Sequence, residues 1–112
     1  MKTADLALRL TRLEDIEAIR ALVARYALGA DRNNDPDILG PLFAADAEWA
    51  CEGFGHYRGR AEIATELARI GREGIHWSLH YMVSPLIEPD PDGRHARCHW
   101  YLWELARMAD GE

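Results

Sequence analysis

The residue with the clearest capacity for chemistry in this 112-residue chain is His80, which lies in the stretch Ile75–Glu88. A histidine gains and loses a proton near neutral pH, so it can act as a general acid or base. The stretch alternates with the period of a β-strand, and Pro85 interrupts regular pairing. The alternation predicts one face with Ile75, Trp77, Leu79, Tyr81 and Val83, and another with His76, Ser78, His80 and Met82.

Asp31 is a candidate partner for this histidine. Thr11 to Glu14 has the form of a capping box, which favours a helix start there, after a variable lead-in over residues 1–10 for which a helix is left open. An apolar stripe then extends the helix to about Asn33, with Asp31 in its last turn. Because the carbonyl end of a helix disfavours a carboxylate, Asp31 needs compensation. Arg32, solvent or a histidine across a cavity would each supply it.

The order of the other elements predicts an α+β fold, with helices packed on a mostly antiparallel sheet. A Gly53–Gly55 turn closes the first strand, a Pro89–Gly93 turn separates the last two strands, and Gly71 is expected to stop a helix. The remaining expected elements are a short helix over 36–43, a strand over 47–52, a helix over 60–70 and strands over 75–88 and 94–108.

Aromatic residues are concentrated in the predicted strands, and Trp49 is expected to point inward. A strongly curved sheet around a pocket would use this bulk, although simple core packing would use most of it as well. The residues concerned are Trp49, Trp77, Tyr81, Trp100, Tyr101 and Trp103.

Composition narrows the class of protein. The length suits one domain over residues 1–112, and the net charge of −6 disfavours nucleic acid and anionic membranes as partners. Neither an apolar run of membrane-spanning length nor a signal-peptide core is present, which predicts a cytoplasmic protein. Cys51 and Cys98 lie in predicted strands without a CxxC pattern, so we expect free, buried thiols.

Spacing argues against several chemistries. His76 and His80, like His95 and His99, are four residues apart, which on a strand separates them by about 13 Å, so we expect no metal site. The sequence has no GxSxG, P-loop or GxGxxG motif in the required context. An aspartate and a histidine from different elements remain. Their pairing would make His80 a general base, whereas the alternative is a core histidine without catalytic function.

Several short motifs, in this order, resemble the SnoaL-like branch of the nuclear-transport-factor-2-like superfamily. The resemblance covers about Leu13 to Met108. The matching segments are residues 26–31 at the end of the first helix, 42–49 leading into the first strand, 57–63 leading into the third helix, and His80 five residues before Pro85.

The resemblance implies a cone-shaped α+β fold, in which a curved sheet and three helices surround a hydrophobic pocket. It further implies that Asp31 and His80 form a catalytic dyad, as in dehydratase and dehydrochlorinase relatives. Tyr26 and Trp49 match positions that line the pocket, and His99 is nearest to a second histidine of the dehydratases. Trp77 and Met82 complete the expected substrate-binding residues.

The implied activity is cofactor-independent proton abstraction, of the dehydratase, isomerase or cyclase type, on a small apolar molecule that contains a ring. A homo-oligomer, either a dimer or a trimer, is also expected.

The chain departs from the family at Ser84, where relatives often have Asn, and the last one or two strands of the family sheet are expected to be missing after Glu112.

The alternative to an enzyme is a non-catalytic assembly module, like the small subunits of ring-hydroxylating dioxygenases. An open cavity at Asp31 and His80 would favour an enzyme, and one filled by Trp77, Trp100 or Trp103 would favour the module.

Overall fold

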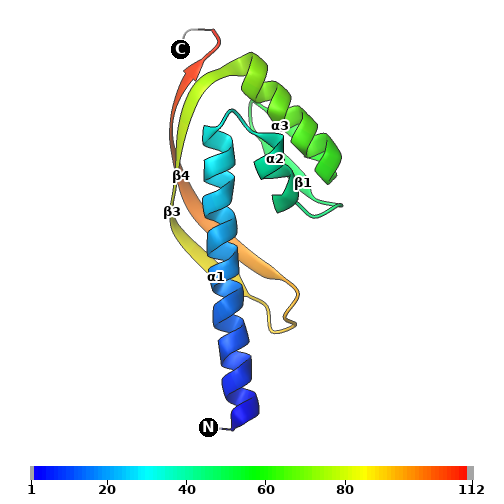
Figure 1. Ribbon diagram of the computed structural model, residues 1–112, viewed down its shortest axis with the longest axis vertical. Coiled ribbons are helices and arrows are strands. Elements are labelled where there is room, and N and C mark those ends of the chain that lie inside the picture. Colours follow the sequence, from blue (N-terminus) through cyan, green and yellow to red (C-terminus); the bar gives the residue numbers. More distant parts are fainter. Residues whose placement is uncertain (1, 111–112) are drawn as a thin grey trace.

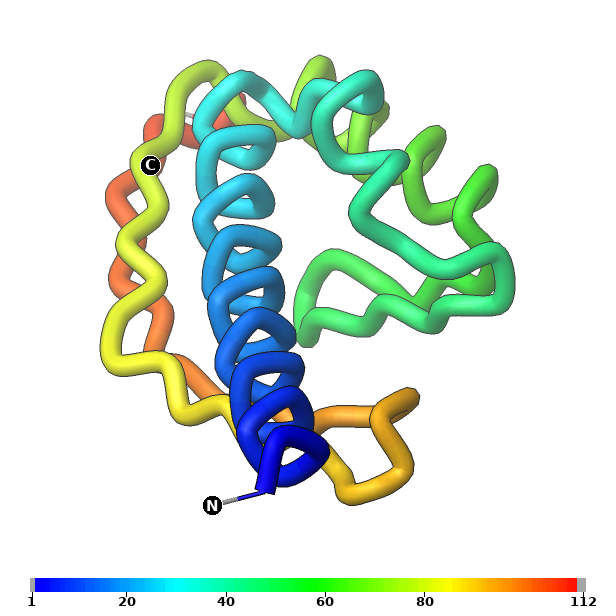
Figure 2. The backbone as a smooth tube through the Cα atoms, turned by 60° about the horizontal axis from the view of Figure 1, so that its bottom comes forward, coloured from blue at the N-terminus to red at the C-terminus, as the bar shows by residue number. Residues whose placement is uncertain are grey.

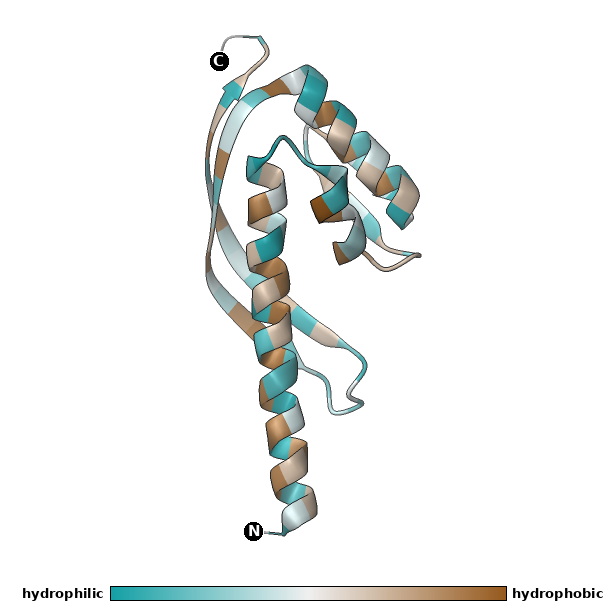
Figure 3. Cartoon of the chain, in the orientation of Figure 1, coloured by the Kyte–Doolittle hydropathy of each residue, from teal (hydrophilic) through white to brown (hydrophobic). Residues whose placement is uncertain are grey.

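Helix α1 (Thr3–Asp31) is the longest element of the computed structural model, which describes residues 2–110. The helix begins at Thr3 and passes through Thr11, so the predicted start at Thr11 is wrong. Residues 3–10 contain no glycine or proline and are rich in leucine and alanine, so the helix continues through them. Figure 3 shows hydrophobic and hydrophilic residues interspersed along α1. The whole molecule measures 60 × 26 × 23 Å.

A long hairpin packs along α1. Its strands are β3 (Ile75–Pro89) and β4 (Ala96–Met108), and they curve past the helix on one side (Figure 1). The other elements lie on the opposite side of α1 (Figure 2). These are α2 (Pro36–Leu39), the 3-10 helix η1 (Gly40–Leu42), β1 (Glu48–Cys51), β2 (Gly55–Arg58) and α3 (Arg60–Gly74).

Strand pairing is antiparallel throughout the described residues. β3 pairs with β4, and β1 pairs with β2 across the turn at Gly53, whose φ of 85° suits glycine. The sequence did not predict β2, because Gly55 was assigned to a turn and Tyr57 and Arg58 to the approach to α3. The α+β class is confirmed.

Two bulges in β3 set the faces of the hairpin. Ile75 pairs with Met108 and Trp77 with Arg107, so His76 is an extra residue without a partner. The bulge turns Ile75 to the face that carries His80, where it is buried, and leaves Trp77 on the opposite face. The prediction that Ile75 and Trp77 share a face is therefore wrong. A second irregularity lies between Val83 and Leu86, where Ser84 has a φ of 54°.

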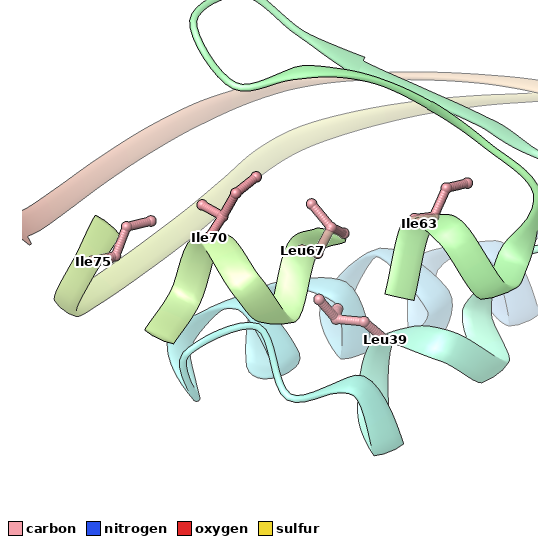
Figure 4. Close-up of a cluster of buried hydrophobic side chains, with 5 residues drawn as sticks. All are labelled: Leu39, Ile63, Leu67, Ile70 and Ile75. Atoms are coloured by element: carbon pink, nitrogen blue, oxygen red, sulfur yellow. The ribbon is translucent and has the colours of Figure 1, made fainter. Parts of the chain in front are cut away.

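The hydrophobic core joins α3 to α2 and the start of β3 (Figure 4). Gly71 lies inside α3, which continues to Gly74, so the predicted stop at Gly71 is wrong. Gly71 is buried against the backbone of Asn33, where a side chain would collide with the carbonyl group. Close packing therefore explains this glycine. The core residues are Leu39, Ile63, Leu67, Ile70 and Ile75.

Candidate active site

The end of α1 is held by side-chain hydrogen bonds to α3 and β3. Asn33 Nδ2 donates to the carbonyl oxygens of Gly71 and Ile75 at 3.3 and 3.1 Å, and Asn34 Nδ2 donates to that of Leu67 at 2.9 Å. Both asparagines adopt left-handed backbone conformations, which this residue type tolerates. The buried Ser78 hydroxyl donates to the carbonyl oxygen of Ala30 at 3.2 Å. These bonds fix the last turn of α1 against β3.

This arrangement brings Asp31 to His80. Asp31 Oδ1 accepts from the backbone N–H of His80 at 2.6 Å and lies 2.9 Å from its ring Nδ1. The compensation that the helix end requires therefore comes from His80, and Arg32 makes no ion pair with Asp31 among the described residues. A carboxylate on Nδ1 fixes the ring orientation and favours the tautomer with its proton on Nδ1. The other ring nitrogen, Nε2, is then the one available for proton transfer.

Glu104 approaches that second nitrogen from β4. It is the direct cross-strand partner of His80, and its Oε1 lies 3.2 Å from Nε2. The His80 side chain is 11% exposed, whereas Asp31 and Glu104 are 25% and 32% exposed. His80 is therefore enclosed between two carboxylates from different elements.

A cavity of about 540 Å³ opens beside His80. Apolar side chains from α1, α3, β1 and the hairpin form most of its wall, and His80, Glu104, Tyr26 and Glu48 contribute polar groups. Trp100 lines the wall, while Trp77 and Trp103 lie outside it, so these tryptophans do not fill the space. Asp31 is not among the lining residues, because it contacts the far side of the His80 ring. This form and size suit a small apolar ligand.

Tyr26 and Trp49 form a second polar feature in the cavity. The Trp49 indole Nε1 donates to the Tyr26 hydroxyl at 2.8 Å. Burial raises the pKa of the Tyr26 phenol above its ordinary value, and the nearby Cys51 and Glu104 raise it further, against the opposing effect of the Trp49 hydrogen bond. Tyr26 is therefore a neutral phenol at physiological pH and can donate a hydrogen bond.

The other predicted substrate-binding residues divide between the two faces of the hairpin. Met82 lines the cavity beside His80, as expected for its face. Trp77 is 52% exposed on the opposite face, where regular alternation from His80 also places it. His99 also lies outside the cavity lining, and its ring packs edge-on against Tyr101 at 5.1 Å. The prediction that Trp77 and His99 line this pocket is wrong.

Sequence reasoning missed Glu104, although a signal was present. The signal was a lone glutamate among the large apolar residues of the last strand. Counting back from the predicted turn at Pro89–Gly93 pairs His80 with residue 102, so the observed register, with Glu104 opposite His80, was not predictable from that turn.

Cys51 lines the same cavity as His80, whereas Cys98 and a group of metal-ligating residue types at the hairpin turn do not. Both cysteines are free, as expected, but Cys51 is exposed, because it lies at the end of β1, whereas Cys98 is partly buried. Ligand atoms of Asp90, Asp92 and His95 lie within 4.8 Å of one another at the hairpin turn. Asp92 there accepts hydrogen bonds from the backbone N–H groups of Arg94 and His95, so the structure of the turn explains why these residues lie together.

Within residues 2–110, no helix is both long and apolar enough to cross a membrane.

Solved structures with the same architecture include several enzymes. LinA superposes with a TM-score of 0.82 at 25% identity, over 92% of this chain and 69% of LinA. A type 2 hexachlorocyclohexane dehydrochlorinase (LinA) gives 0.82 at 26% identity, over 92% of this chain and 68% of its own. A scytalone dehydratase-like protein from Novosphingobium aromaticivorans gives 0.73 at 22% identity, over 88% and 64% of the two chains.

These superpositions confirm the cone-shaped α+β fold that the sequence resemblance implied. No curated protein sequence matches the chain significantly. A family profile described as the SnoaL-like domain matches residues 11–112, nearly the full length. The chain therefore belongs to the SnoaL-like domain family of the nuclear-transport-factor-2-like superfamily.

Proposed function

We propose that this protein is a cofactor-independent lyase or isomerase in which His80 removes a proton from a small apolar substrate. Asp31 orients the His80 ring and stabilises the positive charge that it acquires. The observation that carries the proposal is the contact of 2.9 Å between Asp31 and His80 Nδ1, with the same histidine facing a largely apolar cavity. General-base catalysis of this kind contributes about 10²- to 10⁴-fold in rate.

The substrate class follows from the cavity and from the relatives. The cavity is lined by apolar and aromatic side chains, which suit a ring compound with few polar groups. They include Leu22, Phe43, Met82 and Trp100. The dehydrochlorinase and the scytalone dehydratase-like protein are named for eliminations, in which a base removes a proton and a neighbouring group departs. A dehydration, an isomerisation or a cyclisation would use the same base.

A nitrobenzisoxazole tests the base directly, because its ring opens when a base removes one C–H proton and releases a coloured phenolate. We expect the wild-type protein to accelerate this opening and His80→Ala to lose about 10²-fold or more, with circular dichroism and melting temperature unchanged. His76→Ala is the matched control, because it removes an exposed histidine from the same strand. Equal rates for wild type and His80→Ala would remove the proposal.

The second candidate function is a non-catalytic assembly module. The observation that favours it is the solvent-exposed face of the hairpin, where Tyr81, Tyr101 and Trp103 are 46%, 64% and 56% exposed. A module would bind its partner through this face, and its affinity would not depend on His80. An enzyme would lose turnover with His80 whether or not this face is covered.

A further inference from the structure

Glu104 is the feature of the site that the dyad does not explain. In a two-residue dyad, Nε2 faces only the substrate, but here a carboxylate oxygen lies 3.2 Å from it. The opposing positions of residues 80 and 104 in the β3–β4 ladder hold this contact in place. Glu104 lines the cavity, so it can reach both His80 and a bound molecule.

The other lining carboxylate, Glu48, differs in its partners. Glu48 lies 3.1 Å from His56 Nε2 and 3.6 Å from an Arg58 guanidinium nitrogen, near the surface. Its charge is therefore balanced by exposed basic groups. Among the described residues, the ion-pair partner of Glu104 is His80.

The protons shared among Asp31, His80 and Glu104 determine what Glu104 can do chemically. With one proton on Nδ1 facing Asp31, a second proton can lie either on His80 Nε2 or on Glu104, and the two arrangements are tautomers of one protonation state. Without this second proton, the Nε2 lone pair would face a carboxylate oxygen and repel it. At 3.2 Å, a proton can pass directly between His80 Nε2 and Glu104 Oε1.

We propose that Glu104 is a second catalytic proton-transfer residue, which delivers a proton to a leaving oxygen and regains one from His80, the proton that His80 has taken from the substrate. This inference rests on the proposed function, because it requires His80 to be the base. It assigns the substrate to compounds that carry a hydroxyl group next to an acidic C–H, such as β-hydroxy carbonyl compounds.

The steps balance without an added reagent. With the second proton on Glu104, His80 Nε2 takes the C–H proton, and the electron pair of that bond forms the enolate. Glu104 protonates the hydroxyl group as its C–O bond breaks, and the proton on Nε2 then passes to the Glu104 oxygen. The products are the unsaturated carbonyl compound and water, and His80 and Glu104 return to their initial charges.

Two probes separate the role of Glu104 from that of His80. The aldol adduct of benzaldehyde and acetone must lose hydroxide, which needs an acid, whereas the nitrobenzisoxazole releases a stable phenolate, which needs none. We expect Glu104→Gln to slow dehydration of the adduct by about 10²-fold or more and opening of the isoxazole by less than about tenfold. Glu88→Gln, which removes one negative charge from an exposed position on β3, should change neither rate.

Other outcomes have defined meanings. Equal losses on both probes would overturn the proposal and make Glu104 a residue that only positions His80, and an unchanged dehydration rate would overturn it as well. If His80→Ala matches the wild type on both probes, the proposed function fails and this inference falls with it. The ¹⁵N resonance of His80 Nε2, measured without substrate, should differ between wild type and Glu104→Gln, and identical resonances would exclude proton sharing.

Discussion

At the scale of single residues, the environment of His80 differs from that of an ordinary core histidine. A core histidine needs one partner for each ring nitrogen, and neutral carbonyl or hydroxyl groups would satisfy it. His80 instead has a carboxylate at each nitrogen, 2.9 Å and 3.2 Å away, and a cavity beside its ring. Two carboxylates stabilise a positive charge on the ring, which is the charge a base acquires when it removes a proton.

The role of Asp31 can be tested with a neutral substitute. Asp31→Asn keeps an oxygen that can accept from the His80 amide but no longer stabilises an imidazolium ion. We expect kcat for the isoxazole to fall by about 10²-fold or more, with KM changed by less than about threefold. Asp5→Asn, in the exposed first turn of α1, is the control. A parallel loss of binding and rate would indicate a structural role for Asp31.

At the scale of elements, the site depends on how the end of α1 packs against α3 and β3. Asn33 bonds to Gly71 and Ile75, and Asn34 to Leu67, so three segments meet within one turn of Asp31. The bulge at His76 then rotates β3 so that Ser78 contacts Ala30 and His80 contacts Asp31. A one-residue change in register would turn His80 away from the cavity.

Gly71 offers a test of this packing. Gly71→Ala would place a methyl group against the Asn33 backbone, so we expect the free energy of unfolding to fall by about 1–3 kcal/mol. Gly74→Ala is the matched control in the same helix, because no atom lies within 4 Å of the new methyl group. That variant should be neutral or more stable by up to about 1 kcal/mol. Chemical denaturation of both variants decides the matter, and equal stabilities would show that the contact is not tight.

At the scale of the whole molecule, the hairpin has one face toward the cavity and one toward solvent. The exposed face carries a group of large apolar residues whose exposed fractions are 45–64%. Single exposed apolar residues are common on protein surfaces, but a group of them on one face is not. Such a patch is typical of an interaction surface. Its residues are Trp77, Tyr81, Val83, Tyr101, Trp103 and Leu105.

We propose that a second copy of the chain covers this face and forms the expected homo-oligomer. Trp103 packs against Tyr81 near the middle of the face, with ring centroids 5.4 Å apart. Sedimentation velocity should show the wild type as a dimer or trimer and Trp103→Lys as a smaller species with unchanged circular dichroism, because a buried lysine charge is costly. Arg107→Lys, which keeps its charge, should not change the assembly. A monomeric wild type would contradict the proposal.

Much of the local structure could be predicted from the sequence. Periodicity and turn residues predicted the hairpin of residues 75–108, the third helix and the position of Asp31 in the last turn of the first helix, because these depend on neighbours along the chain. The start of α1 at Thr3 was missed, since a capping pattern inside a run of good helix formers does not interrupt it. Strand β2 was missed because its residues lie between two glycines, Gly53 and Gly59, and were assigned to a turn and to the approach to α3.

The sequence by itself determined the α+β class, the family and the two residues proposed as the dyad. Only the tertiary structure decided that Glu104 faces His80, that Ile75 faces the cavity, and that His99 does not line it. The physical reason is that a strand has two faces, and a single extra residue such as His76 exchanges them. Bulges are set by long-range packing against α1 and α3, which the alternation of residues along one strand cannot reveal.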